Sequence, residues 1–163
     1  MKQLHSKWNN RRHPAPKRKD LESFCRRAAF FAGLPDTEWE LELLFTNDRS
    51  MARYNAEIVG HEGTTDVITL SWFDDPEGLF PGDPELILIV NPDAAAREGA
   101  EREESSYSCE VALYVVHGML HAAGEDDLEE APRLSMRAAE KRVMAALAQE
   151  FSFASLFPES KEP

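Results

Sequence analysis

Two histidines four positions apart, His117 and His121, are the residues whose types and spacing most clearly favour chemistry. On a helix, positions i and i+4 lie one turn apart on the same face, so both imidazole rings can be directed at a common point. The neighbouring residues are mostly apolar, and burying two neutral imidazoles without partners is costly. Binding one metal ion satisfies both rings, so the pattern predicts a metal site.

A third ligand is expected just beyond this helix. Gly124 can take a positive φ and reverse the chain, so that the following residues return beside the histidines. Asp127 is then the natural third ligand, with Asp126 as the alternative. Two nitrogens and one oxygen with an open fourth position are typical of hydrolytic zinc. We therefore predict one Zn²⁺ per chain, held by His117, His121 and Asp127; the alternative is two core histidines beside a solvated acidic loop.

The same spacing occurs in the His-Glu-x-x-His-x-x-Gly-x-x-His pattern of metzincin peptidases, with Asp127 in place of the last histidine. In those enzymes the Glu is the general base, and here Gly118 occupies its position. Hydrolysis of peptides or other small molecules is therefore a less favoured hypothesis for this chain. Zinc lowers the pKa of a bound water toward about 7 without a dedicated base, which suits phosphodiester cleavage better.

The elements that must position these residues mix strands and helices without strict alternation. Alternating, β-branched or wholly apolar runs predict strands near Leu4 and at residues 39–45, 65–72 and 85–90. Helical periodicity and composition predict helices at residues 21–31, 49–57, 93–101, 104–123 and 128–150. We expect an α+β fold with a mainly four-stranded mixed sheet packed with about five helices, and the zinc site at the end of the buried central helix.

Composition narrows the class of protein. The 163 residues carry a formal net charge of −12, which argues against binding free nucleic acid by overall attraction. The sequence has no apolar run of the roughly 20 residues that a membrane helix needs, and its start lacks the apolar stretch of a signal peptide. Cys25 and Cys109 suit reduced thiols. We expect a cytoplasmic protein with no membrane association and no dinucleotide cofactor.

A family resemblance adds to these observations. The string His-Gly-Met-Leu-His-Ala-Ala-Gly-Glu-Asp-Asp at residues 117–127 closely resembles the His-Gly-x-Leu-His-Leu-x-Gly-x-Asp-His signature of the YbeY family, bacterial zinc-dependent endoribonucleases of ribosomal RNA maturation. Residues 60–70 resemble the family's block ending Pro-Thr-Asp-Val-Leu-Ser-Phe, and residues 85–90 resemble its Gly-Asp-Ile strand region. The similarity spans about residues 47–148. It implies a zinc site at the edge of a cleft lined by Thr65 and Asp66, where Asp66 either positions water or a cation or caps the strand.

Three departures from the family pattern matter. Asp127 replaces a histidine, and an anionic ligand should make the bound water less acidic and move activity to higher pH. Val59 stands where the family has an arginine, which removes an expected clamp on the scissile phosphate. His61 is the nearby residue that can donate to a phosphate or shuttle a proton; the alternative is an ordinary loop histidine. Pro84 replaces a glycine and is expected to alter only a turn.

The resemblance implies a single-strand-specific, metal-dependent endoribonuclease in maturation and quality control of small-subunit ribosomal RNA. Because the chain is acidic, we expect the small ribosomal subunit, or a ribosomal protein with basic extensions, to deliver the RNA. The alternative is a ribosome-assembly factor with a structural or residual zinc site and little nuclease activity, since Val59 removes the clamp.

Three segments are expected: a basic N-terminal arm at residues 1–19, a single metal-dependent hydrolase domain at 20–150, and a C-terminal tail at 151–163. The arm contains Arg11, Arg12, Lys17, Arg18 and Lys19. The sequence leaves open whether this arm is flexible or grips RNA.

Overall fold

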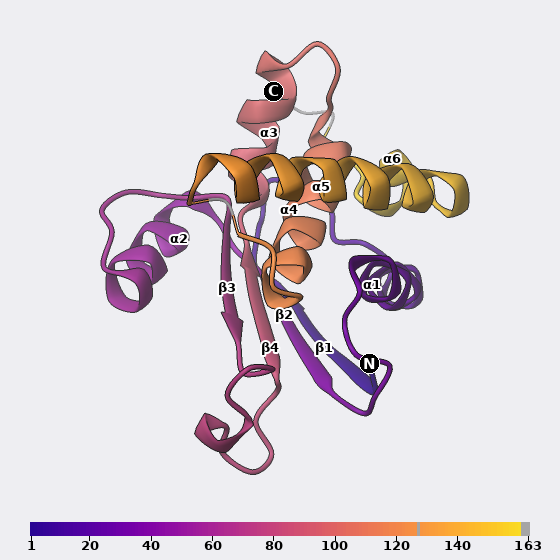
Figure 1. The fold of residues 1–163 in the computed structure, drawn as a ribbon. Helices are drawn as coiled ribbons and strands as arrows, with labels where there is room; N and C mark the ends of the chain where they lie inside the picture. The colour runs from indigo at the N-terminus through magenta and orange to yellow at the C-terminus, as the bar shows by residue number, and fades with distance from the viewer. Residues whose placement is uncertain (127, 161–163) are drawn as a thin grey trace.

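Four strands form one mixed sheet with the order β1-β2-β4-β3 (Figure 1). The computed structural model describes residues 1–126 and 128–160. The strands are β1 (Gln3–Trp8), β2 (Glu40–Phe45), β3 (Val67–Ser71) and β4 (Leu86–Val90). β1, β2 and β4 are parallel, and β3 pairs antiparallel with β4 at one edge. The expected four-stranded mixed sheet is confirmed.

The described part of the chain contains six α-helices. They are α1 (Arg18–Ala32), α2 (Asp48–Tyr54), α3 (Pro92–Glu101), α4 (Tyr107–Ala122), α5 (Glu130–Glu150) and α6 (Phe153–Leu156). A π-helical turn, Asn55–Val59, extends α2, and a 3₁₀ turn, Pro76–Gly78, lies in the loop between β3 and β4. The α+β class is confirmed, with one short helix more than the sequence predicts. In this part of the chain no helix has the length and apolarity needed to cross a bilayer.

Helix α4 is the centre of the core. It packs against β3, β4, α1, α5 and α6, which explains why its sequence is apolar on most sides. Val111, Val115 and Met119 are fully buried in it. The arrangement is visible in Figure 1, where α4 lies between the sheet and α5. A helix buried on so many sides provides a rigid base for side chains at its C-terminal end.

Glycine at position 118 lets α4 approach the sheet closely. A Cβ built there would lie 2.5 Å from Leu88 Cδ2 and 3.1 Å from Thr69 Oγ1. A side chain at this position would therefore be directed at the sheet. Gly118, which stands where the metzincin pattern has its catalytic Glu, is therefore explained by the close packing of α4 on the sheet.

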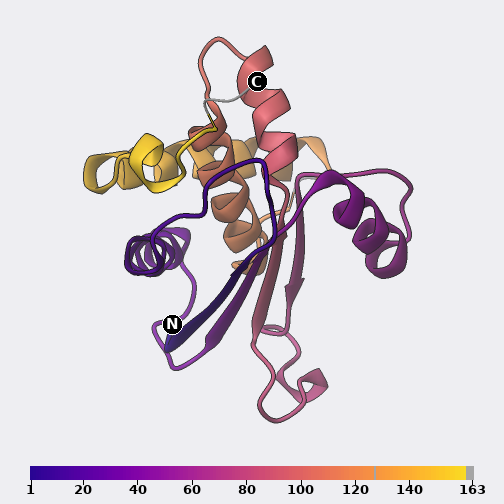
Figure 2. The ribbon, with the colours of Figure 1, turned by 180° about the vertical axis from the view of Figure 1, so that it is seen from behind.

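The opposite face of the sheet carries a smaller apolar cluster. Met51 from α2 packs there against Ile68 and Ile89, with Leu44 and Leu70 partly buried around them. This contact holds α2 beside the β3 edge (Figure 2). Asn47 caps α2 by accepting a hydrogen bond from the Ser50 N–H at 2.9 Å.

Both ends of the described chain belong to the folded unit. The segment at residues 1–19 contains β1, which is an edge strand of the sheet, and the beginning of α1. The segment after residue 150 forms α6, and Phe157 behind it is fully buried. The Phe157 ring packs edge-on against Phe24, with 5.7 Å between ring centroids.

Candidate metal centre

The two histidines lie together on one face of α4, near its C-terminal end. The ring centroids of His117 and His121 are 4.6 Å apart and the ring planes meet at 81°. Both residues are partly buried. The spacing-based prediction that the two imidazoles approach each other is therefore confirmed.

A hydrogen bond at Nδ1 fixes the orientation of each ring. His117 Nδ1 lies 2.5 Å from Glu140 Oε1 on α5, and His121 Nδ1 lies 3.1 Å from the Glu125 carbonyl oxygen. Both partners are acceptors, so each Nδ1 carries the proton and donates it. Nε2 is then the nitrogen whose lone pair would bind a metal ion. Carboxylate or carbonyl acceptors behind ligating histidines are the usual supporting arrangement of metal sites in proteins.

Gly124 makes the turn that supplies one of these acceptors. Its φ is 104°, which an L-residue rarely adopts. The Gly124 N–H donates to the His121 carbonyl at 3.0 Å, and the Glu125 N–H donates to the Leu120 carbonyl at 2.9 Å. The chain reversal expected at this glycine is confirmed, and it returns the Glu125 carbonyl to the His121 ring.

The expected third ligand, Asp127, lies outside the described residues, and its role stays a prediction. Among residues 1–126 and 128–160, no three His, Cys, Asp or Glu side chains are grouped closely enough to hold a metal ion. Asp126 Oδ1 accepts a hydrogen bond from the Leu128 N–H at 3.0 Å, so this carboxylate is engaged in the local turn. Two oriented imidazoles on a partly buried face nevertheless fit the donor set of zinc.

A cleft of about 690 Å³ opens beside the histidines along the β3 edge. His61, Asp66, His117 and His121 all line it, so the structure brings together the four described residues that the sequence singles out. Val59 lines the same cleft and is 43% exposed. The position where the resemblance leads us to expect an arginine thus faces the same space as the histidines.

The loop that carries His61 is tied to the end of α2. The His61 N–H donates to the Asn55 carbonyl at 3.2 Å, and the Asn55 amide donates to the Gly63 carbonyl at 2.9 Å. Asn55 is itself buried. These two bonds hold an exposed imidazole at the mouth of the cleft, where it can contact a ligand.

Asp66 has a local structural role as well as a place in the cleft. Its Oδ1 accepts hydrogen bonds from the Val67 N–H at 2.7 Å and from the Thr65 hydroxyl at 3.3 Å. This is the strand-capping alternative that the sequence leaves open. A catalytic role for Asp66 stays a prediction.

A polar network fixes the neighbouring wall of the cleft. The buried Asn91 amide donates to Asp48 Oδ1 at 2.8 Å, to the Thr64 hydroxyl at 3.0 Å and to the Thr65 carbonyl at 3.1 Å. Hydrogen bonds from Arg97, and then from Asn91 and Thr64, lower the pKa of the Asp48 carboxyl. The charged network therefore holds the Thr64–Thr65 segment at the start of β3.

Sequence reasoning misses Glu140, Glu125 and Asn91. Glu140 follows His117 by 23 positions on a different helix, so no short motif joins them. Glu125 contributes a carbonyl, which every residue has. Asn91 follows an apolar strand and precedes a proline, a pattern that signals a helix cap but not its contacts with Thr64 and Thr65.

Comparisons with known proteins point to one family. The family model described as Endoribonuclease YbeY matches residues 5–148. The "Endoribonuclease YbeY" of Rhizobium meliloti strain 1021 is 33% identical over 142 residues, covering 81% of this chain and 84% of that protein. The protein of the same name from Anaeromyxobacter sp. strain Fw109-5 is 30% identical over 138 residues, covering 84% and 68%.

A solved structure shares the fold. The solution structure of TM1509 from Thermotoga maritima matches with a TM-score of 0.56 and 16% sequence identity, covering 90% of this chain and 93% of that one. The fold and the cleft define an α+β protein with paired histidines at the edge of a mixed sheet. By the family match and the relatives, the chain belongs to the YbeY endoribonuclease family.

Proposed function

We propose that this chain is a zinc-dependent endoribonuclease that cleaves single-stranded ribosomal RNA in the cytoplasm during maturation and quality control of the small ribosomal subunit. The observation that carries the proposal is the pair of imidazoles beside the cleft, each held through Nδ1 by a separate acceptor. Because Nδ1 of each ring donates to its acceptor, Nε2 is the nitrogen that would bind a metal ion. Family membership supplies the reaction class.

His117, His121 and Asp127 would hold the zinc ion, which would supply a Lewis acid beside a phosphodiester. Side chains of the protein contact and position the RNA. His61, at the mouth of the cleft, donates a hydrogen bond to a phosphate oxygen or passes a proton to the leaving oxygen. Asp66, Thr65 and the Asn91 network fix the wall against which the RNA lies.

A single strand is the substrate that suits this cleft. The reacting groups lie among side chains from β3, α4 and the loop before β3, and not on a projecting element that could enter a duplex groove. Single-stranded RNA can bend its backbone into such a hollow and splay its bases outward. We propose that a ribosomal protein or the small subunit brings that strand to the acidic chain, whose net charge is −12.

The test is cleavage of single-stranded and duplex versions of one ribosomal RNA fragment by zinc-loaded protein. His117→Ala should abolish cleavage, and His5→Ala, on β1 away from the cleft, should leave it unchanged. Cleavage of the single strand alone, lost only in His117→Ala, supports the proposal. Equal cleavage by His117→Ala would overturn it.

A second candidate function follows from Val59. Because a valine occupies the cleft where the family has an arginine, the chain could bind RNA and zinc as a ribosome-assembly factor with little nuclease activity. Stoichiometric zinc without cleavage of any single-stranded ribosomal RNA fragment would favour this function.

A further inference from the structure

Four cationic side chains gather around the loop that follows β1, on a protein of net charge −12. Arg11, Arg12 and Arg49 line a hollow of about 340 Å³, and Lys7 lines a neighbouring hollow of about 540 Å³. Asn9 lines both hollows, so the two are adjacent. We call Lys7, Arg11, Arg12 and Arg49 the basic rim.

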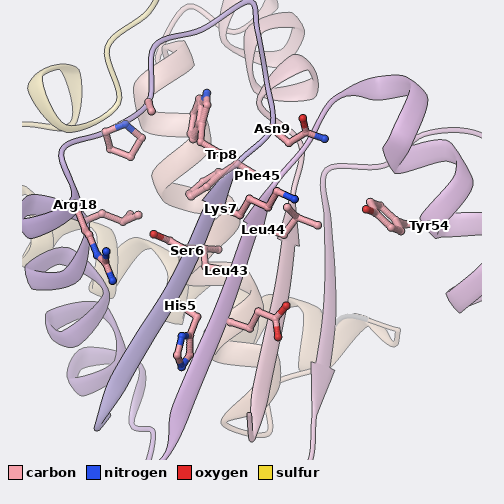
Figure 3. Close-up of a pocket in the computed structure, with 14 residues that line it drawn as sticks. His5, Ser6, Lys7, Trp8, Asn9, Arg18, Leu43, Leu44, Phe45 and Tyr54 are labelled. Atoms are coloured by element: carbon pink, nitrogen blue, oxygen red, sulfur yellow. The ribbon is translucent and has the colours of Figure 1, made fainter. Parts of the chain in front are cut away.

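The rim cations are exposed. Within the described part of the chain, Lys7, Arg11, Arg12 and Arg49 form no ion pair, whereas Arg26, Arg27, Arg97 and Arg102 each pair with a carboxylate. In Figure 3, Lys7 and Asn9 lie on the side of β1 that faces Leu44. Exposed cations without a carboxylate partner can pair with the phosphates of an anionic ligand.

The backbone under the rim is rigid. The buried Asn10 amide donates to the Thr46 carbonyl at 3.0 Å and to Asp93 Oδ1 at 3.1 Å. Asn10 Oδ1 accepts from the Arg12 N–H at 2.9 Å. The Trp8 indole N–H lies 2.9 Å from the Asn10 carbonyl and 3.0 Å from that of His13. A loop held this firmly presents its cations in a fixed arrangement and loses little entropy when it binds a ligand.

Helix α2 connects the rim to the candidate metal centre. Arg49 lies in its first turn, and Asn55, immediately after its end, lines the cleft with His117 and His121. Six residues of helix rise about 9 Å. Asp48, which lines the rim hollow, also bonds to Thr64 at the cleft wall. An extended polyanion leaving the cleft along α2 therefore reaches the rim within a short distance.

We propose that the basic rim binds phosphates of the RNA strand outside the cleft and so provides an additional substrate-binding surface. The inference rests on the proposed function, because it assumes that RNA occupies the cleft. Lysine and arginine gathered around this hydrogen-bonded loop suit a phosphate backbone, whose negative charges repeat at every nucleotide. The surface compensates for the missing arginine at Val59 by contributing affinity away from the scissile phosphate.

The test compares the zinc-loaded protein with a variant that carries Arg11→Gln, Arg12→Gln and Arg49→Gln. The control variant carries Arg26→Gln, Arg27→Gln and Arg142→Gln, which removes the same charge from the α1 and α5 surface. Fluorescence anisotropy measures binding of single-stranded RNAs of about 20 and about 5 nucleotides across salt concentrations. Anisotropy is read at low temperature directly after mixing, before cleavage proceeds, and gel analysis checks that the RNA is still intact. Thermal unfolding checks that the variants fold.

The rim variant should bind the longer RNA at least tenfold more weakly, with its salt slope reduced by about 2, because three phosphate contacts on a single strand contribute about 0.7 each. The shorter RNA and the control variant should show wild-type affinity. If the rim variant and the control variant bind the longer RNA with the same affinity and the same salt slope, the inference is overturned. It is also overturned if the rim substitutions weaken binding of an acidic ribosomal protein and leave RNA binding unchanged. If RNA binding depends on the rim but the wild type does not cleave RNA, the proposed nuclease function is refuted and the inference about the basic rim is supported.

Discussion

His117 on α4 and Glu140 on α5 are joined by a contact of 2.5 Å between Nδ1 and Oε1. The carboxylate fixes the imidazole tautomer and makes the ring a stronger ligand. Both side chains are mostly buried, with 23% and 18% of the His117 and Glu140 side chains exposed. The position of α5 on α4 is therefore part of the candidate metal centre.

Removal of this carboxylate should weaken zinc binding. We expect Glu140→Gln to lower zinc affinity by roughly 10-fold and Glu140→Ala by up to about 100-fold. Competition with a chromogenic chelator measures the dissociation constants. Glu150→Gln on the same helix, which loses only a surface pair with Arg27, is the control and should bind zinc like the wild type. Unchanged affinity in Glu140→Ala would show that Glu140 does not support a metal ligand.

A cation restored at the cleft should raise activity. Val59 lines the cleft with His61 and His117, and a guanidinium there can pair with a phosphate. We expect Val59→Arg to increase kcat/KM on single-stranded RNA by roughly tenfold. Ile58→Arg adds the same charge to the adjacent residue, which is equally exposed, and should give a smaller gain. If both variants gain equally, general electrostatic attraction and not a phosphate clamp explains the effect.

Gly118 should tolerate alanine poorly despite the better helix propensity of alanine. The added Cβ would lie 2.5 Å from Leu88 Cδ2, and Leu88 is fully buried. We expect Gly118→Ala to reduce the free energy of unfolding by about 1–3 kcal/mol in urea titrations. Combined with Leu88→Val, the loss should be less than the sum of the single losses, because the contacting methyl group is gone. A more stable Gly118→Ala protein would contradict the close approach of α4 to β4.

The hydrogen bonds and ion pair of Asp48 should make the free energy of unfolding depend on pH. Because Arg97, Asn91 and Thr64 lower the pKa of Asp48 in the folded protein, its stabilising effect is present above the ordinary aspartate pKa of about 3.9 and is lost as the pH falls through the lowered value. The difference in unfolding free energy between wild type and Asp48→Asn should stay constant near neutral pH and shrink below about pH 4. Asp74→Asn, in an exposed loop, should show no such trend. A difference that grows on acidification would contradict the network.

Much of this fold is predictable from local patterns. The alternation of apolar and polar residues before Phe45 predicts β2, because a strand buried on one face alternates in this way. The apolar run ending at Val90 predicts β4, because a strand buried on both faces is apolar throughout. The i, i+4 spacing of His117 and His121 predicts a shared helix face, and Gly124 predicts the turn that follows. Each inference depends on residues within one element and its cap.

Long-range contacts are the part that sequence reasoning misses. β1 carries only one buried residue, Leu4, so its alternation is weak and its pairing with β2 comes from the sheet as a whole. Glu140 reaches His117 only because α5 packs across α4. The rigidity of the basic loop likewise depends on Asn10 meeting Thr46 and Asp93, which lie 36 and 83 positions away.

The central claim is that His117, His121 and Asp127 form a zinc site that supports RNA cleavage. The most direct test is the zinc content of purified wild type, His121→Ala, Asp127→Ala and Asp126→Ala, measured beside cleavage of one single-stranded ribosomal RNA fragment. We expect near-stoichiometric zinc and cleavage in the wild type and in Asp126→Ala, and loss of both in the other two variants. A wild-type protein that binds no zinc, or an Asp127→Ala protein that keeps both zinc and cleavage, would contradict the account.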